Sequence, residues 1–365
     1  MTEALLVLAD GAVFRGRSIG KPGRASGEVV FNTSMTGYQE MLTDPSYAGQ
    51  LLVLTYPMIG NYGIDAAVEE SAVIQPQGFI VREASTTPSH IRSTGTISDL
   101  LEARGVVGIE GIDTRAVTRR IRKEGVMAGT ITTEEVAEAA LVRIRAMPPY
   151  DDTNWVTTVT TPTSYAWQGT GTPSRFRVAL LDGGVKRNIM RSLETRGAEI
   201  TVYPADTPAQ TLLEGNPDGV VLSPGPGDPR LLDAMVRETG ALIGRVPILG
   251  ICLGHQMVAR ALGAGTFKLP FGHRGGNHPV KDLRTGAVTI TAQNHGYAVD
   301  PDGLSSAAEV SRINLNDNTV EGLSMRSEPL LTIQYHSEAS PGPLDSTGIF
   351  DEFVTMMHEA GGRKR

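Results

Sequence analysis

From about residue 176 onward, short apolar runs alternate with stretches in which apolar residues recur every three or four positions. The predicted strands are 176–181, 198–203, 218–223 and 247–251, and the predicted helices are 184–196, 207–214, 229–244 and 253–262. Strands that alternate with helices indicate a parallel sheet with helices on both faces. Residues 264–340 return to a β-rich pattern.

Residues 1–150 show another pattern, in which short β-rich runs are interrupted by Gly, Pro and Asn. The predicted strands are 28–32 and 50–55, and the predicted helices are 113–124 and 133–146. Asp113 can cap the first of these helices and Gly125 can end it. This block therefore predicts a mixed, β-rich domain.

Between the two patterns, residues 151–175 are rich in Thr, with Pro and Gly interspersed and no clear period. Such a composition is typical of a connection. The chain has 365 residues, more than a single hydrophobic core usually supports. We therefore predict an α/β protein with a β-rich N-terminal domain at 1–150, a linker at 151–175 and a mostly parallel-sheet domain at 176–365.

Composition narrows the classes of function and location. The formal net charge of −7 argues against a nucleic-acid binder, since affinity for nucleic acid depends on neutralising phosphates. No run approaches the ~20 apolar residues of a membrane span, and the N-terminus has no basic segment ahead of an apolar core. A single cysteine cannot form an intrachain disulfide. These features predict a cytoplasmic protein without a membrane segment.

That single cysteine lies in the run Gly250-Ile-Cys-Leu-Gly254, after a predicted strand and before a predicted helix. The spacing matches a nucleophile elbow, in which flanking glycines allow a sharp turn. The start of a helix also favours a thiolate over a thiol. The alternative interpretation, a buried and inert thiol, stays open on this run alone.

Three further runs carry candidate chemistry. The loop Ser223-Pro-Gly-Pro-Gly-Asp-Pro229 either offers N–H groups to an oxyanion or is only a rigid turn; it lacks the lysine of a nucleotide P-loop. His336-Ser-Glu338 places an imidazole and a carboxylate on one strand face, as either a proton shuttle or a solvated surface pair. The run 293–297 either binds a polar ligand or forms a β-turn.

We predict no metal site, because no further His or Cys pair has ligand spacing. His273 and His278 are interpreted as loop and packing residues.

Taken together, these runs make residues 178–340 resemble the class I glutamine amidotransferase domain, with its Cys, His and Glu triad. Nearly the whole chain resembles the small subunit of carbamoyl-phosphate synthetase. The runs that carry this closer resemblance are Val30-Phe-Asn-Thr-Ser-Met-Thr-Gly-Tyr-Gln-Glu40, Thr43-Asp-Pro-Ser-Tyr-Ala-Gly49, Gly111-Ile-Asp-Thr-Arg115, Gly184-Val-Lys-Arg-Asn188, Gly275-Gly-Asn-His-Pro279 and Glu338-Ala-Ser-Pro-Gly-Pro343. Two departures are Ser337, where many members have proline, and Gly183, where the family often has a bulky residue.

The resemblance implies that Cys252 attacks glutamine, that His336 moves protons and that Glu338 holds His336. The residues that it implies for glutamine binding are Ser46, Gly225, Gly227, Leu253, Gln256, Asn294, Gly296 and Tyr297. It implies no cofactor on this chain. The implied partner is a large subunit that uses ATP, Mg and bicarbonate to make carbamoyl phosphate for pyrimidine and arginine synthesis. A higher oligomer of such heterodimers is left open.

Three rival hypotheses remain at this point. The chain could serve another amidotransferase, although the N-terminal block argues against that. It could be a catalytically dead scaffold, which the intact Cys252, His336 and Glu338 disfavour. It could be an ester or peptide hydrolase that uses the same elbow.

Overall fold

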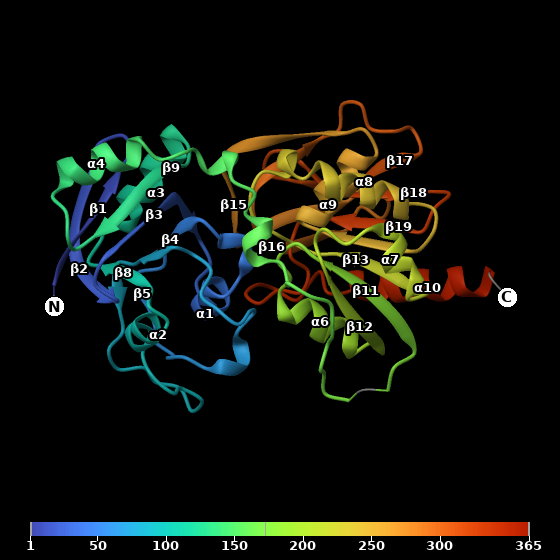
Figure 1. The fold of residues 1–365 in the computed structure, drawn as a ribbon, viewed down its shortest axis with the longest axis horizontal. Coiled ribbons are helices and arrows are strands. Elements are labelled where there is room, and N and C mark those ends of the chain that lie inside the picture. Colours follow the sequence, from blue (N-terminus) through green and yellow to red (C-terminus); the bar gives the residue numbers. More distant parts are fainter. Residues whose placement is uncertain (1, 172, 364–365) are drawn as a thin grey trace. The chain divides into compact units, whose positions relative to one another are not determined.

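The computed structural model describes residues 2–171 and 173–363. The chain divides into two compact units, Met1–Thr153 and Asn154–Arg365, and each is described by itself (Figure 1). Within the described part of the chain, no helix has both the length and the apolar character that crossing a bilayer requires.

The N-terminal unit is built on a closed barrel with the strand order β1-β2-β8-β6-β4-β3-β9. Its strands are β1 (Glu3–Leu8), β2 (Val13–Gly20), β3 (Arg24–Asn32), β4 (Gln50–Leu54), β6 (Gly78–Ile80), β8 (Val107–Glu110) and β9 (Met127–Thr132). A separate two-stranded sheet pairs β5 (Met58–Ile59) with β7 (Glu83–Ala84). The helices are α1 (Tyr38–Leu42), α2 (Ile97–Ala103), α3 (Thr114–Glu124) and α4 (Ala137–Arg145). This confirms the mixed, β-rich prediction.

Two helices of this unit show how local signals set helix ends. The Asp113 side chain accepts from the N–H of Ala116 and begins α3, and Gly125 ends it with a φ of 90°. The predicted helix at 133–146 begins later, at Ala137. The reason is that Thr132 Oγ1 accepts from the N–H groups of Glu134 and Glu135, which holds these residues in a turn.

The C-terminal unit contains a ten-stranded sheet with the order β10-β12-β11-β13-β14-β19-β18-β16-β15-β17. Its strands are β10 (Tyr165–Ala166), β11 (Phe176–Asp182), β12 (Ala198–Pro204), β13 (Gly219–Leu222), β14 (Ile248–Ile251), β15 (Gly265–Asp282), β16 (Val288–Asp300), β17 (Ala308–Asn314), β18 (Val320–Met325) and β19 (Leu330–Ile333). The five neighbours from β12 to β19 pair in parallel, and β10 and β15 to β18 pair antiparallel.

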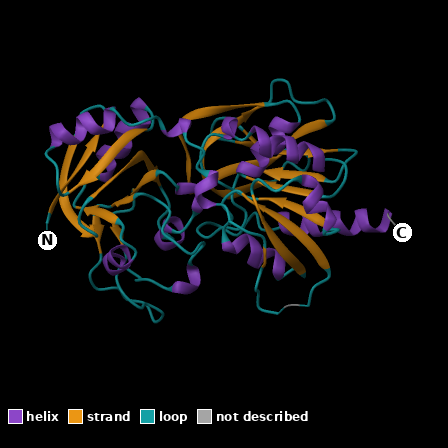
Figure 2. Cartoon of the chain, in the orientation of Figure 1, coloured by secondary structure: helices purple, strands orange, loops and turns teal. Residues whose placement is uncertain are grey.

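Helices cover both faces of this sheet (Figure 2). They are α6 (Arg187–Glu194), α7 (Ala209–Glu214), α8 (Asp233–Leu242), α9 (Leu253–Ala261) and α10 (Ile349–Arg363). Along β11, Val178 and Leu180 pack with α6 and α10, whereas Ala179 and Leu181 pack with α7, α8 and α9. Successive strand residues point to opposite faces, so the continuous apolar run fills two cores. The α/β prediction is confirmed.

The segment 151–175, predicted as a linker, is in part built into the C-terminal unit. Within it, α5 (Val156–Val159) places Val156 in the core under α7 to α9, and β10 pairs antiparallel with β12. Trp167 packs against the opposite core, and its Nε1 donates to Glu194 at 3.2 Å. A strand of two residues is too short to show a period in the sequence, which is why the pattern indicated only a connection.

Candidate active site

Cys252 occupies a sharp turn between β14 and α9. Its backbone has φ 52° and ψ −102°, a left-handed conformation that is strained for a residue with a side chain. Two glycines make the turn fit. A Cβ on Gly254 would lie 2.2 Å from the carbonyl oxygen of Leu222, and one on Gly250 would lie 2.9 Å from the backbone of Gly254. The run therefore folds as the predicted nucleophile elbow.

The Cys252 thiol is buried and lies among polar groups from two strands. The thiol Sγ is 3.9 Å from the carbonyl oxygen of Asn294 on β16. The amide of Gln334, just past β19, donates to Sγ at 3.5 Å. The Cys252 N–H donates to Ile333 O at 2.8 Å, which ties the elbow to the end of β19. Cys252 therefore has polar contacts in addition to its packing in the apolar core.

His336 and Glu338 follow β19 and form a buried pair. His336 Nδ1 lies 2.7 Å from Glu338 Oε1, and its backbone N–H donates to Ala292 O on β16 at 2.9 Å. A buried lysine completes the arrangement, because Lys186 Nζ lies 3.0 Å from the same Glu338 oxygen and donates to Ala339 O at 2.7 Å. The result is a row of groups that can carry alternating charge, from Lys186 through Glu338 to His336.

The electrostatics of this row follow from burial and charge together. Burial raises the pKa of Glu338, but the charges of Lys186 and His336 outweigh it and lower that pKa to about 2. Burial lowers the pKa of His336, but the Glu338 charge and the interaction with the Cys252 thiol raise it to about 10. His336 is therefore held in its charged form beside Cys252.

The loop after β13 packs against the elbow. The N–H of Gly254 donates to Ser223 O at 3.1 Å, and Ser223 Oγ accepts from the N–H of Gly183 at 2.8 Å. Gly227 has a φ of 91°. Leu253 is the first residue of α9, so its N–H has no acceptor within the helix. The loop and the elbow are thus hydrogen-bonded to each other through Ser223, and the role of their backbone N–H groups as oxyanion donors stays a prediction.

Among the predicted binding residues, Asn294 lies against the Cys252 thiol, and Gln256 is linked to it through Gln334. Gln256 on α9 donates through Nε2 to Tyr297 O at 2.9 Å and to Gln334 Oε1 at 3.0 Å. Asn294, Gly296 and Tyr297 lie on β16, which runs unbroken through 293–297. The β-turn alternative for that run is therefore wrong. Ser46 belongs to the N-terminal unit, in the short 3-10 helix Pro45–Tyr47, and its role in glutamine binding stays a prediction.

Two residues that contact the triad were not predicted as site residues. Lys186 is visible in the sequence only as one residue of the run 184–188, and nothing local marks it as the ion-pair partner of Glu338. Gln334 lies two positions before His336, and its side chain type alone does not indicate a role. Both act through contacts between segments that are distant in sequence, which a sequence motif does not encode.

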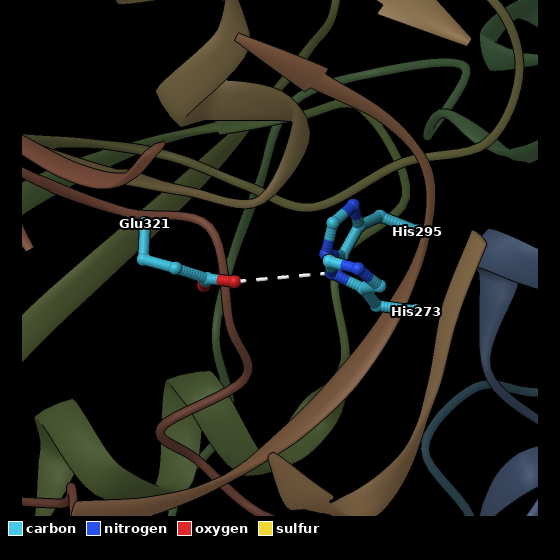
Figure 3. Close-up of side chains that lie close together, drawn as sticks. All are labelled: His273, His295 and Glu321. Atoms are coloured by element: carbon cyan, nitrogen blue, oxygen red, sulfur yellow. Dashed lines mark ion pairs between the residues drawn. The ribbon is translucent and has the colours of Figure 1, made fainter. Parts of the chain in front are cut away.

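A cluster of metal-ligand types lies behind β16. Figure 3 shows His273, His295 and Glu321, whose candidate ligand atoms lie within 4.8 Å of one another. The interpretation of His273 and His278 as loop residues is wrong, because both lie on β15. The outer partners are Asp317, at 2.8 Å from His273 Nε2, and the Tyr297 carbonyl, at 2.7 Å from His295 Nδ1. These residue types could hold a divalent ion, but His273, His295 and Glu321 each already have a hydrogen-bond partner in the protein.

Two family models match the chain. The model for the CPSase domain of the carbamoyl-phosphate synthase small chain matches residues 6–131, and that for class-I glutamine amidotransferase matches residues 179–356. A carbamoyl phosphate synthase small chain of Akkermansia muciniphila is 49% identical over 362 residues, which cover 97% of each chain. The chain belongs to the carbamoyl-phosphate synthase small-chain family.

Other members of the family are equally similar along their whole length. Small chains of Syntrophotalea carbinolica and Aquifex aeolicus are both 48% identical, and the matches cover 98% and 97% of this chain. The resemblance found in the sequence is therefore confirmed for both halves of the chain. The family match at 6–131 also explains why the barrel accompanies an amidotransferase domain here.

Proposed function

We propose that this chain hydrolyses L-glutamine to glutamate and ammonia and passes the ammonia to a large subunit that makes carbamoyl phosphate from bicarbonate and ATP. The observation that carries the proposal is the buried His336–Glu338 pair, 2.7 Å apart, next to a lone cysteine on a strained elbow. Family membership supports the proposal that the large subunit that receives the ammonia makes carbamoyl phosphate.

The chemistry begins with the Cys252 thiolate attacking the carboxamide carbon of glutamine. N–H groups of Leu253 and Gly227 stabilise the oxyanion, and losing one such donor typically costs ~10²–10³ in rate. The C–N bond breaks as His336 protonates the leaving nitrogen, which departs as ammonia and leaves a glutamyl thioester. His336 then takes a proton from water, the resulting hydroxide attacks the thioester, and glutamate and the thiolate are released.

Glu338 supports both steps by holding His336 in one orientation and stabilising its charged form. The glutamine itself contacts backbone and amide groups from several segments. These proposed contacts are Ser46, Gly225, Gly227, Leu253, Gln256, Asn294, Gly296 and Tyr297. The chain binds no cofactor in this scheme, and ATP and Mg act on the large subunit, in pyrimidine and arginine synthesis.

The deciding experiment compares wild type with Cys252→Ser in complex with the co-purified large subunit. We expect the variant to lose glutamine-dependent carbamoyl phosphate formation and to keep formation from free ammonia. Glutaminase activity retained in the variant contradicts the mechanism. A co-purified partner that makes no carbamoyl phosphate contradicts the proposed acceptor, and turnover of esters without glutamine hydrolysis would favour the hydrolase alternative.

A further inference from the structure

Behind the elbow, four buried side chains form a hydrogen-bonded group that the proposed mechanism does not use. Glu321 on β18 is fully buried, and its two oxygens accept from different amides. Asn314 Nδ2 donates to Oε1 at 2.8 Å, and Gln293 Nε2 lies 3.0 Å from Oε2. Gln293 Oε1 in turn lies 3.0 Å from His295 Nε2. Figure 3 shows Glu321 facing the two imidazoles across this space.

The protons in this group can be counted. The Tyr297 carbonyl can only accept, so His295 Nδ1, at 2.7 Å from it, must carry a hydrogen. If Gln293 presents its oxygen to Nε2, then Nε2 must carry a second hydrogen, and His295 is a buried cation. Burial opposes this strongly and holds the pKa of His295 well below its ordinary value.

Exchanging the oxygen and nitrogen of the Gln293 amide removes the conflict without moving a heavy atom. The amide nitrogen then donates to a neutral His295, and the amide oxygen faces Glu321 Oε2, which must carry a proton to donate to it. The exchange gives up a contact between the amide and Thr291 Oγ1 at 3.1 Å, since that hydroxyl donates to His278 O. One neutral hydrogen bond is a smaller loss than two buried charges.

A second contact points the same way. His273 Nε2 faces an Asp317 oxygen at 2.8 Å and so carries a hydrogen, and burial, which lowers the pKa of His273, favours the neutral ring. Its other nitrogen, Nδ1, is buried without a hydrogen bond and lies 3.9 Å from Glu321 Oε1. The negative charge of an ionised Glu321 would repel this lone pair. A neutral carboxyl group repels it much less.

The group is linked to the nucleophile by two routes. Gln293 and His295 flank Asn294, whose carbonyl lies 3.9 Å from Cys252 Sγ. The Tyr297 carbonyl that accepts from His295 also accepts from Gln256, which donates to Gln334 Oε1. Gln334 in turn donates to Sγ at 3.5 Å, and its backbone N–H donates to Glu321 O at 2.9 Å.

We infer that Glu321 is held as a neutral carboxylic acid on the acid side of neutrality and in that form is a positioning residue, which through Gln293 and His295 keeps the segment 293–297 in place beside Cys252. The positioning role rests on the proposed function. Burial supports the neutral form, since it raises the pKa of Glu321 to about 7.

Several titratable or charged groups surround Glu321 and contribute to its environment. They are His273 on β15, His295 on β16, Asp317 before β18 and Tyr335 after β19. His278 and Arg274 on β15 lie next to the two imidazoles. Among them, the Asp317 charge further raises the pKa of Glu321, and the donating amide of Asn314 lowers it.

A metal ion is the competing interpretation of the cluster. It would have to displace the Asn314 or Gln293 amide from Glu321 and the Gln293 amide from His295 Nε2. The ligand atoms, up to 4.8 Å apart, would also have to close in, since all must lie about 2.0–2.2 Å from a zinc ion. The proton-carrying network satisfies the same atoms without such a rearrangement.

The test compares three variants of the full chain, Glu321→Gln, Glu321→Ala and the exposed control Glu359→Gln, by glutaminase kinetics against pH. Titration of the triad is common to all of them, so it cancels in the ratio of wild-type to variant kcat/KM. Glutamine cannot ionise and can still donate to Gln293. We therefore expect the ratio of wild type to Glu321→Gln to be near one at about pH 6. At about pH 8 only about a tenth of Glu321 in the wild type keeps its proton, so the ratio should fall to about one tenth.

The fall in wild-type kcat/KM at high pH should appear as a rise in KM, because the segment 293–297 carries proposed glutamine contacts. Glu321→Ala should have a low kcat/KM at every pH. Glu359→Gln should give a ratio near one throughout. A ratio for Glu321→Gln that does not change with pH, or a Glu321→Gln variant as impaired as Glu321→Ala at pH 6, overturns the inference. So does stoichiometric zinc in the purified chain that is lost from Glu321→Ala.

Infrared difference spectra separate this inference from the proposed function. Wild type minus Glu321→Gln should show the carbonyl band of a protonated carboxylic acid at pH 6, and that band should vanish at pH 9. A wild type without glutaminase activity overturns the proposed function and the positioning role together. The band decides the protonation state in either case, and its absence at pH 6 overturns the neutral form of Glu321.

Discussion

The ion pair between Lys186 and Glu338 gives the sharpest prediction about the triad. Both side chains are almost fully buried, at 2% and 0% exposure, with 3.0 Å between Nζ and Oε1. Replacing Lys186 by Met removes the charge and keeps most of the apolar stem. Glu338 is then left without its lysine, and breaking a buried pair in this way typically costs about 3–5 kcal/mol.

The pKa of Glu338 gives a second measure of the same interaction. A fall from the ordinary 4.5 to about 2 corresponds to about 3 kcal/mol, shared between Lys186 and His336. Because that pKa is depressed, the stabilisation is present above about pH 4.5 and is lost as the pH falls towards 2. In Lys186→Met the pKa of Glu338 rises towards the unfolded value, so the loss of stability between pH 4.5 and 2 should become smaller and end at a higher pH.

The assay is urea unfolding of the purified chain at several pH values, together with glutaminase kinetics. We expect Lys186→Met to lower the free energy of unfolding by about 3–5 kcal/mol. It should also lower kcat, because Glu338 loses the contact that fixes its carboxylate beside His336. The control Lys123→Met removes an ion pair that is 82% and 49% exposed, and should change neither quantity measurably.

A double variant tests whether the charge itself is responsible. In Lys186→Met combined with Glu338→Gln no unpaired charge is buried, so stability should recover relative to Lys186→Met while activity does not. The reasoning is refuted if the free energy of unfolding of Lys186→Met lies within about 1 kcal/mol of the wild-type value and falls with acid pH in the same way.

Three further predictions follow from other parts of the structure. A Cβ at Gly254 would lie 2.2 Å from a carbonyl of β13, so Gly254→Ala should lower the free energy of unfolding by about 3 kcal/mol and abolish glutaminase activity. The control Gly348→Ala, whose Cβ would have no atom within 4 Å, should leave unfolding curves and kinetics unchanged. Gly240→Ala on α8 meets only an ordinary contact at 3.8 Å and should stabilise by about 0.5–1 kcal/mol, so an unchanged or lower melting temperature would contradict it. Arg143→Lys loses the two-pronged contact with Glu135, at 2.8 and 3.1 Å, and should destabilise the barrel unit by about 1 kcal/mol, measured as a shift in urea midpoint; a midpoint equal to wild type would show that the fork geometry is not needed.

Helices with strong local signals were predicted almost residue for residue. The helix at 113–124 has its cap, its amphipathic face and its terminal glycine within one short stretch, and α3 has the same ends. The helix predicted at 184–196 is shorter, because Asp182 Oδ1 accepts from the N–H groups of Gly184 and Val185 and holds a turn after β11. Side chains that compete for backbone N–H groups are hard to weigh in a sequence pattern.

Strands were predicted where they are buried on both faces and missed where they are short or polar. The apolar runs of β11 and β14 stand out because both of their faces pack against helices. The run 293–297 was open between a turn and a binding segment because Asn and Gly favour turns, yet β16 continues through it. Cross-strand pairing with β15 decides the matter there, and pairing partners are distant in sequence.

Local sequence was sufficient for the elbow, the order of strands and helices in the second half and the family, since each depends on residues close together along the chain. Tertiary structure alone showed that Lys186 faces Glu338 and that Glu321 faces His273 and Gln293. The physical reason is that charge and protonation depend on burial and on neighbours within a few ångströms, and residues that lie far apart along the chain become such neighbours only when it folds.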